Sequence, residues 1–379
     1  MTTSAPAKKL AGLAATLVLA VGCAPQSPEI RSVAATSACT NASVLTGWTI
    51  HRLARQTVVV PVQETNVAAV TSEVADGVGG VILFGSTAPL DLGTDIAALR
   101  ARALGGIAPL VMTDEEGGAV QRMANLVGSM PSAREMGATM TATEIRALAH
   151  KVGLRMHAAG VTMDLAPVLD LDGRAGPNST DAIGTRSFST DPHTAAVDGL
   201  AFAGGLREVS VIPVAKHFPG IGRATGNTDV GPASTPSWTS VQTYDLLPFK
   251  SAVAVSIPAI MVSNAAVPGL TTRPASLSPA VITGVLRTDM QFRGLVMTDS
   301  LTAGGVSGRG WPLTSAAVTA LIAGADTLLF NASTSAVANV TDQIVEAIVS
   351  AVLSGKLSRI RLENAARHVL TAKHVDLCA

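Results

Sequence analysis

Eight short apolar segments recur along the chain, and longer stretches of helical character separate them. The segments are rich in Val, Ile, Leu and Met, and none alternates cleanly between apolar and polar positions. Continuous apolar runs of this length are typical of strands that are buried on both faces, as parallel strands are. They begin at Thr57, Gly80, Ala108, Val161, Val211, Ala259, Gly294 and Asp326.

The segments between these runs predict helices that cover the sheet. Examples are TATEIRALAHKVGLRMHAAG after Met140 and IVEAIVSAVLSGKLSRIRLENAARHVL near the C-terminus. Eight strand–helix units in a chain of this length predict the α/β class, as a single (β/α)8 TIM barrel. An open doubly wound sheet is the main alternative.

Polar side chains follow most of the predicted strands. Active sites of (β/α)8 barrels lie at the C-terminal ends of the strands, so this arrangement favours the barrel and predicts a site at that rim. The residues are Asp114, Asp170, Lys216, His217, Asn264, Asp299 and Asn331.

Composition narrows the function classes. The chain has 379 residues, with 27 basic against 27 acidic side chains, so we expect no nucleic-acid partner. Aromatic residues make up only 3% of the chain, which favours a short substrate over a long stacking cleft. The seven His show no ligand spacing such as HExxH, and we expect neither a metal nor an organic cofactor.

Residues 1–22 predict a lipoprotein signal peptide. Lys8 and Lys9 precede the apolar run LAGLAATLVLAVG, which is short for a membrane span and ends at Cys23. The letters AVGC resemble the lipobox of bacterial lipoproteins. A lipidated Cys23 would anchor a monomer to the extracytoplasmic face of the cell membrane, through the lipid alone. The alternative is an ordinary cleaved signal peptide, and a partly secreted protein also fits.

The remaining cysteines lie near the two ends of the mature chain. Cys39 falls in residues 23–45, which are rich in Ser, Ala, Thr and Pro and predict a tether before a catalytic domain at 46–379. Cys39 and Cys378 are two cysteines apart from Cys23, and an even number of cysteines in an oxidising compartment suggests a disulfide. Two free thiols are the alternative.

Two clusters offer carboxylates. Asp299 ends the apolar strand of GLVMTDSL, where a stiff element would point a nucleophile or an electrostatic stabiliser; alternatively it caps the next helix. In TDEEGGAVQRM, Asp114 ends the third strand and Arg122 can reach back to it. Such a carboxylate can accept hydrogen bonds from the neighbouring hydroxyls of a sugar. Glu115 and Glu116 are expected to be solvated turn charges.

Two clusters offer cations. Arg186 lies in AIGTRSFSTDP after a long loop and carries little weight by itself. Lys216 and His217 are consecutive polar residues at the end of a buried strand. Successive side chains of a regular strand point to opposite faces, so we expect the backbone to bend there. Both side chains could then bind the hydroxyls of a ring.

These motifs together resemble the family 3 glycoside hydrolases, and specifically the single-domain bacterial β-N-acetylglucosaminidases of the NagZ type. KHFPGIG, TDEEGGAVQR, APVLDL, GTRSF and GLVMTDSL carry the resemblance, which spans residues from about 50 to 370. It implies that Asp299 is the nucleophile of a retaining reaction with a covalent glycosyl-enzyme. It also implies a set of residues that bind the N-acetylglucosaminyl ring: Asp114, Arg122, Arg186, Lys216 and His217.

The sequence departs from this family at the proton donor. In NagZ-type enzymes the loop after KHFPGHG carries an Asp-x-His dyad, whose His is the acid/base. This chain has Asn227 and Asp229 at those positions, and Ile221 replaces the His of KHFPGHG. Asp229 is the candidate acid/base, provided that lid closure desolvates it, with Asn227 holding its carboxyl by a hydrogen bond. Alternatively, another carboxylate or a water molecule carries out the proton transfer, or acid/base catalysis has been lost.

The sequence therefore predicts an exo-β-N-acetylglucosaminidase that releases terminal N-acetylglucosamine from peptidoglycan fragments. A sugar-binding lipoprotein with little or no turnover is the main alternative, and a family 3 β-glucosidase or phosphorylase is another. A serine esterase is a third, because TDSL resembles the GDSL block, with His374 and Asp376 near the C-terminus.

Overall fold

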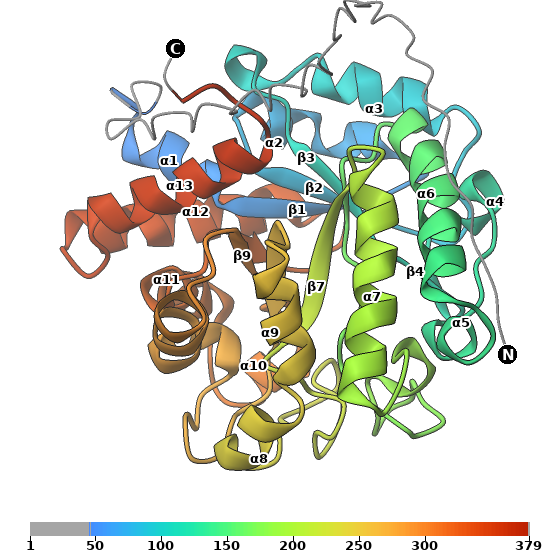
Figure 1. Ribbon diagram of the computed structural model, residues 1–379. Coiled ribbons are helices and arrows are strands. Elements are labelled where there is room, and N and C mark those ends of the chain that lie inside the picture. Colours follow the sequence, from blue (N-terminus) through green and yellow to red (C-terminus); the bar gives the residue numbers. More distant parts are fainter. Residues whose placement is uncertain (1–44, 46, 378–379) are drawn as a thin grey trace, which may run out of the picture. The chain divides into compact units, whose positions relative to one another are not determined.

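The described residues form an eight-stranded parallel sheet surrounded by helices (Figure 1). The computed structural model describes Leu45 and residues 47–377. The expected signal peptide, Cys23, Cys39 and Cys378 lie outside these residues. The strands, in their order around the sheet, are β10 Leu328–Leu329, β1 Val58–Gln63, β2 Gly80–Phe84, β3 Leu110–Thr113, β6 Met163–Asp164, β7 Ile212–Phe218, β8 Ala259–Val262 and β9 Leu295–Thr298.

The two edges of the sheet meet. A parallel bridge joins Met297 to Thr327, and the amide of Thr298 donates to the carbonyl of Thr327 at 3.1 Å. The prediction of a (β/α)8 barrel is therefore confirmed, and the open sheet is wrong. The strand expected from Val161 is shorter than its apolar run, since Pro167 has no amide N–H to continue the ladder.

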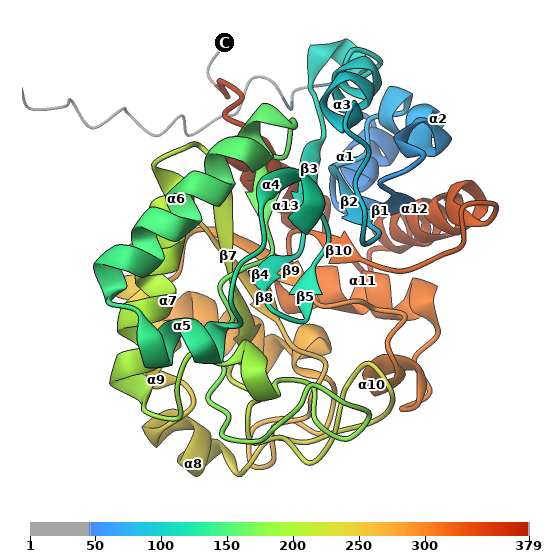
Figure 2. The ribbon, with the colours of Figure 1, turned by 90° about the vertical axis from the view of Figure 1, so that its right-hand side faces the viewer.

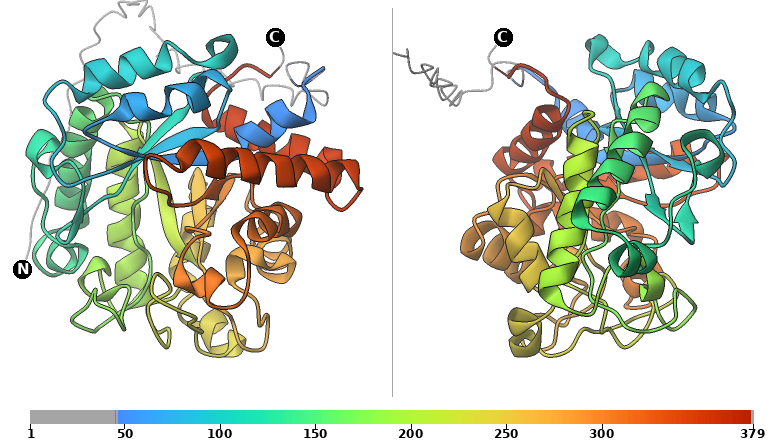
Figure 3. Two further views of the ribbon diagram at one scale, coloured as in Figure 1. Left: turned by 180° about the vertical axis from the view of Figure 1, so that it is seen from behind. Right: turned by 45° about the vertical axis from the view of Figure 1, so that its right-hand side comes forward.

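Helices cover the outside of the barrel, and Figure 3 shows them from two further sides. None of those in the described part of the chain is long and apolar enough to cross a membrane. The α-helices are α1 Ile50–Gln56, α2 Thr71–Ala75, α3 Leu92–Arg100, α4 Ala124–Val127, α5 Ala133–Thr139, α6 Ala142–Ala158, α7 Pro192–Arg207, α8 Trp238–Thr243, α9 Leu247–Ala254, α10 Gly304–Ser307, α11 Leu313–Ala323, α12 Val337–Leu353 and α13 Arg359–Ala372. The π-helix η6, Ala280–Asp289, lies between β8 and β9, and the 3-10 helices are η2 Val67–Val70, η3 Leu104–Gly106, η4 Gly184–Arg186 and η5 Ala275–Leu277.

Local signals explain the helix boundaries. A capping box formed by Thr141 and Glu144 starts α6, which confirms the helix expected after Met140. The long segment near the C-terminus is two helices, α12 and α13, and not one. Gly355 between them has φ +74°, which favours glycine, and Ser358 caps α13 through the amide of Arg361.

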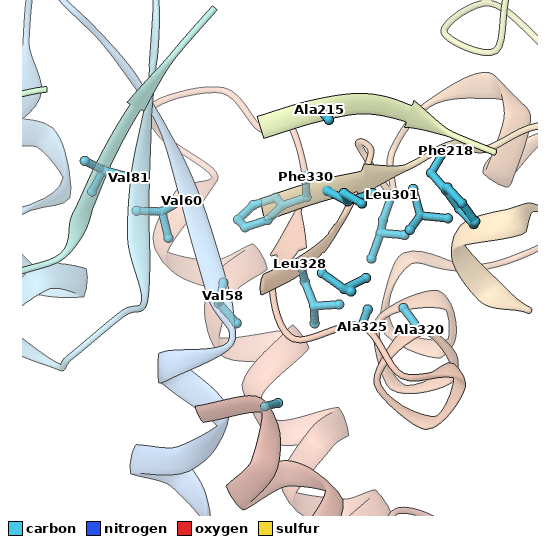
Figure 4. Packing of buried hydrophobic residues seen from close by; sticks show 14 of the residues in the cluster. Val58, Val60, Val81, Ala215, Phe218, Leu301, Ala320, Ala325, Leu328 and Phe330 are labelled. Carbon is cyan, nitrogen blue, oxygen red and sulfur yellow. The ribbon is translucent and has the colours of Figure 1, made fainter. Parts of the chain in front are cut away.

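Apolar side chains fill both sides of the sheet. Helices α6 and α7 lie side by side (Figure 2), and Gly205 lets their backbones approach closely. Between sheet and helices, residues such as Val58, Val60, Phe218 and Leu328 form the larger cluster (Figure 4). Inside the barrel, Val59, Ile82, Leu110, Met112, Met163, Leu165, Val214, Ala259, Met261, Leu295, Met297 and Leu329 pack together with Val369 of α13.

Candidate active site

A pocket of about 250 Å³ lies at the C-terminal ends of the strands. Every residue expected at the catalytic and sugar-binding site lines it: Asp114, Arg122, Arg186, Lys216, His217, Asp229 and Asp299. Strand direction explains this convergence, because parallel strands bring their C-terminal ends to one rim. Apolar side chains that include Ile82, Leu165, Met261 and Leu329 complete the lining.

A buried charge network forms one wall of the pocket. Lys216 Nζ donates to Asp114 Oδ1 at 2.7 Å and lies 2.5 Å from Glu116 Oε1. Arg186 binds the same Glu116 through two hydrogen bonds of 2.7 and 2.8 Å. Arg122 reaches back to Asp114, with Nη2 3.8 Å from Oδ2, as the sequence suggested. These contacts fix the positions of Asp114, Lys216, Glu116 and Arg186.

The network sets the ionisation of its members. Burial alone would raise the pKa of Glu116, but the guanidinium of Arg186 and the ammonium of Lys216 hold it well below its usual range. Burial alone would lower the pKa of Lys216, but the carboxylates of Asp114 and Glu116 raise it above its ordinary value. Glu116 and Lys216 are therefore both charged at neutral pH, as an acceptor and a donor for a polar ligand.

The expectation that Glu115 and Glu116 are solvated turn charges is wrong. Glu116 is 4% exposed and Glu115 is fully buried. Glu115 Oε1 accepts hydrogen bonds from the backbone amide of Arg122 at 2.7 Å and from that of Met123 at 2.5 Å. Its Oε2 accepts a hydrogen bond from the side-chain amide of Gln121. The chain forms a short antiparallel hairpin there, β4 Glu115–Gly117 with β5 Val120–Gln121, which folds both side chains inward. The consecutive glycines Gly117 and Gly118, which allow a tight turn, were the feature of the sequence that could have predicted this hairpin.

Asp170 positions His217. Its Oδ2 accepts from the His217 backbone amide at 3.1 Å and lies 2.7 Å from the ring nitrogen Nδ1. Its other oxygen accepts the amide of Ile221 at 2.7 Å. Both Lys216 and His217 face the pocket, and the β7–β8 register shifts between Ala215 and Phe218, which confirms the expected irregularity. The sequence marks Asp170 only as a polar residue at the rim, because its partner His217 lies 47 residues away.

Asp299 directly follows β9 and lines the same pocket. Its Oδ1 accepts the amide of Ser300 at 2.7 Å, and Asn264 donates to the Ser300 carbonyl at 2.7 Å. Burial raises the pKa of Asp299; the charge of His217 opposes this, and the nearby Asp229 carboxylate raises the pKa further. Two carboxylates therefore share the pocket closely enough to influence each other.

The loop that carries Asp229 is attached to the segment after β9. The amide of Gly304 donates to the carbonyl of Asp229 at 3.1 Å, and that of Gly305 to the carbonyl of Thr228 at 2.7 Å. The side chain of Asp229 is exposed although it lines the pocket. The expected hydrogen bond from Asn227 to the Asp229 carboxyl is replaced by others: Asn227 accepts the backbone amide of Asp229 and donates to the carbonyl of Asn178.

The geometry does not support a serine esterase. Ser300 Oγ lies at the C-terminal rim, 2.9 Å from the Thr302 hydroxyl. His374 follows α13, and its neighbour Lys373 donates to Gln56, the last residue of α1, which lies two positions before β1 at the other end of the barrel. Ser300 and His374, which a serine esterase would need side by side, therefore lie at opposite ends of the strands.

Comparisons with known proteins agree with this site. Residues 51–372 match the family model described as the glycosyl hydrolase family 3 N-terminal domain. The chain is 38% identical over 304 residues to β-hexosaminidase LpqI of Mycobacterium tuberculosis, covering 78% of this chain and 76% of that protein. It is 34% identical over 248 residues to a β-hexosaminidase of Stenotrophomonas maltophilia, covering 62% of this chain and 72% of that one.

Solved structures show the same fold. The structure of M. tuberculosis LpqI superimposes with a TM-score of 0.78 at 33% identity, covering 88% of this chain and 96% of that one. A family 3 β-N-acetylglucosaminidase from Paenibacillus sp. gives a TM-score of 0.79 at 27% identity, covering 86% of this chain and 62% of that one. With the barrel and its rim of charged residues, these matches show that the chain belongs to glycoside hydrolase family 3 and is a glycosidase.

Proposed function

We propose that the protein is a retaining exo-β-N-acetylglucosaminidase that releases terminal N-acetylglucosamine from peptidoglycan fragments. The observation that carries this proposal is that Asp299 and Asp229 line the same pocket as the Asp114–Lys216–Glu116–Arg186 network. Relatives named β-hexosaminidase, at 38% and 34% identity, support the sugar class.

The proposed reaction has two displacements. Asp299 attacks the anomeric carbon while Asp229 gives a proton to the leaving oxygen, so that the glycosidic bond breaks and a glycosyl–Asp299 ester forms. Asp229 then removes a proton from water, whose oxygen displaces Asp299 and restores the original anomeric configuration. Because Asp229 is exposed, the loop has to close over the bound sugar to desolvate it, in the manner of other active-site lids.

The location is part of the same proposal. The lipobox-like AVGC would attach the mature protein through Cys23 to the outer side of the membrane, where cell-wall fragments are the N-acetylglucosamine source. A Cys23→Ser variant should then move from the membrane fraction to the soluble fraction. Equal partition of both forms would contradict the anchor without affecting the enzymatic assignment.

The test of activity is release of the aryl alcohol from an aryl N-acetyl-β-glucosaminide, with Asp299→Ala as the matched blank. We expect turnover by the wild type and its loss in the variant, followed by release of N-acetylglucosamine from a disaccharide muropeptide. Folded wild-type protein without turnover of this substrate would contradict the proposed N-acetylglucosaminidase activity.

A further inference from the structure

Arg122 is held less firmly than the other four side chains of the buried charge network. Its Nη2 lies 3.8 Å from Asp114 Oδ2, and its guanidinium carbon lies 5.6 Å from the centre of the Phe84 ring. Its Nε is buried and has no hydrogen-bond partner within the residues that the structure describes. The position of this guanidinium therefore depends mainly on where the Arg122 backbone is held.

Glu115 holds that backbone. It lies opposite Gln121 in the hairpin of β4 and β5, and its Oε1 accepts hydrogen bonds from the backbone amides of Arg122 at 2.7 Å and Met123 at 2.5 Å. Val120 and Arg122 line the active-site pocket, whereas Glu115 is fully buried and is not part of its lining. Glu115 can therefore act on a ligand in this pocket only through the residues that it holds.

The hydrogen bonds of Gln121 determine what Glu115 has to offer. The side-chain oxygen of Gln121 accepts from the Met130 amide at 2.8 Å, and its nitrogen donates to the Gly128 carbonyl at 3.0 Å and to Glu115 Oε2 at 2.9 Å. Three N–H donors thus point at the two oxygens of Glu115, and a carboxylate accepts all three. A protonated carboxyl would place its own O–H against one of these donors, and the NH2 of a glutamine would do the same.

Two carboxyl groups adjoin Glu115. Asp114 precedes it in the chain, and Asp164 of β6 accepts its backbone amide at 2.9 Å. Asp164 is fully buried, and burial together with the charges of Glu115 and Asp114 raises its pKa well above the ordinary value. Asp164 therefore keeps its proton while Glu115 ionises. The cations of this region are Lys216 of β7, which pairs with Asp114 at 2.7 Å, and Arg122 itself.

We propose that the ionised carboxylate of Glu115 positions Arg122, and that the sugar site loses affinity when this carboxylate takes up a proton. This inference rests on the proposed function, since it assumes that Arg122 contacts the bound N-acetylglucosamine. Protonation would break one of the three hydrogen bonds and loosen the segment from Gln121 to Met123. Glu115 is a positioning residue and not a catalytic one, because it reaches the sugar only through Arg122.

The switch would operate near neutral pH. Burial raises the pKa of Glu115 to about 7, although the three hydrogen bonds oppose the shift. Above that pH the carboxylate is ionised and holds Arg122, and below it the group is protonated and the hold is lost. Activity should therefore fall as pH decreases, whereas the contribution of the same group to stability changes in the opposite direction.

The ratio of kcat/KM between wild type and Glu115→Gln, measured against pH, isolates this group. The substrate is an aryl N-acetyl-β-glucosaminide, and an alkaline quench ionises the released aryl alcohol in every sample. We expect a ratio near one below about pH 6 and about tenfold above about pH 8, with its midpoint near 7. The titrations of Asp229 and Asp299 cancel in this ratio because both proteins share them. Most of the loss should be in KM, since Arg122 binds the ring.

A double-mutant cycle shows whether Glu115 acts through Arg122. Added to Arg122→Ala, the Glu115→Gln substitution should change kcat/KM by less than about twofold at about pH 8, although it costs about tenfold in the wild type. Glu73→Gln, at a buried glutamate of α2 that contacts Ser72, is the matched control and should leave kcat/KM unchanged at every pH.

The outcomes separate this inference from the proposed function. A ratio that does not vary with pH, or a loss from Glu115→Gln that persists in full beside Arg122→Ala, would overturn the positioning role while the glycosidase proposal stands. A folded wild type that does not hydrolyse the glycoside at any pH would overturn the proposed function, and this inference with it.

Discussion

Arg186 and Glu116 form a two-point ion pair beside the active-site pocket, with Nε 2.7 Å from Oε2 and Nη2 2.8 Å from Oε1. The two residues are 70 positions apart in the chain, and both side chains are largely buried. Lys216 contacts the same carboxylate from a third element, β7. The third nitrogen, Nη1, donates to the carbonyl of Ala182 at 2.7 Å. A guanidinium held at all three nitrogens has a fixed orientation, so it can meet a substrate without rearrangement.

Removing the Glu116 charge should damage both stability and activity. Glu116→Gln leaves Arg186 and Lys216 buried with only Asp114 to balance them. We expect the free energy of unfolding to fall by about 3 kcal/mol, and kcat/KM to fall by about a hundredfold because both cations lose their orientation. Urea denaturation and aryl-glycoside hydrolysis measure the two effects. Glu208→Gln, which removes a partner of Arg146 at the surface, is the control and should change stability by less than about 1 kcal/mol.

Asp229 should matter most for substrates with poor leaving groups. If it donates the proton, Asp229→Ala lowers kcat by about 10²- to 10⁴-fold for a disaccharide. An activated aryl glycoside, whose leaving group needs little protonation, should lose far less in the first displacement. Steady-state kinetics over a series of leaving groups measures this difference. A uniform loss across the series, or none, would assign the proton transfer to another group.

The close contact between the Asp229 loop and α10 should require glycine at position 304. A Cβ on Gly304 would lie 2.2 Å from the carbonyl oxygen of Val230, so the loop backbone would have to move. We expect Gly304→Ala to lower kcat/KM at least about tenfold by displacing Asp229, with only a small change in melting temperature. Gly231→Ala is the matched control in the same loop, because no atom lies within 4 Å of its Cβ. Full activity of Gly304→Ala would show that the loop position observed is not needed for turnover.

Glu115 should make stability depend on pH. Burial raises its pKa from 4.5 to about 7, although amides from Met123 and Arg122 and the Gln121 side chain oppose the shift. Below pH 4.5 the group is protonated in both states, and between 4.5 and 7 only the folded state retains the proton. This residue therefore lowers the free energy of unfolding by on the order of 3 kcal/mol as pH rises through that window.

Replacement by glutamine should abolish this contribution. We expect the difference in unfolding free energy, wild type minus Glu115→Gln, to decrease from pH 4.5 to pH 7 and to level off above it. Denaturation curves at several pH values measure the difference, in which titrations common to both proteins cancel. Parallel pH profiles would mean that Glu115 stays ionised in the folded protein.

Much of the barrel and of its site could be predicted from the sequence. Buried parallel strands have a distinctive apolar pattern, and their polar ends necessarily meet at one rim, so Asp114, Lys216, His217 and Asp299 were predicted to converge. Whether the side chains of a short polar turn are exposed or buried could not be predicted in this way. Glu115 and Glu116 look like solvent-facing turn residues until a hairpin and two distant cations enclose them.

The sequence by itself determined the fold, the family and which polar residues meet at the C-terminal rim, because those depend on periodicity and on motifs that are local in the chain. Only the tertiary structure decided which groups are partners across long separations. Asp170 with His217 and Glu116 with Arg186 are brought together by the pairing of neighbouring strands and by the loops that follow them, and no short-range pattern encodes these distances. Burial, and with it the pKa of Glu115 and Asp299, follows from the same long-range packing.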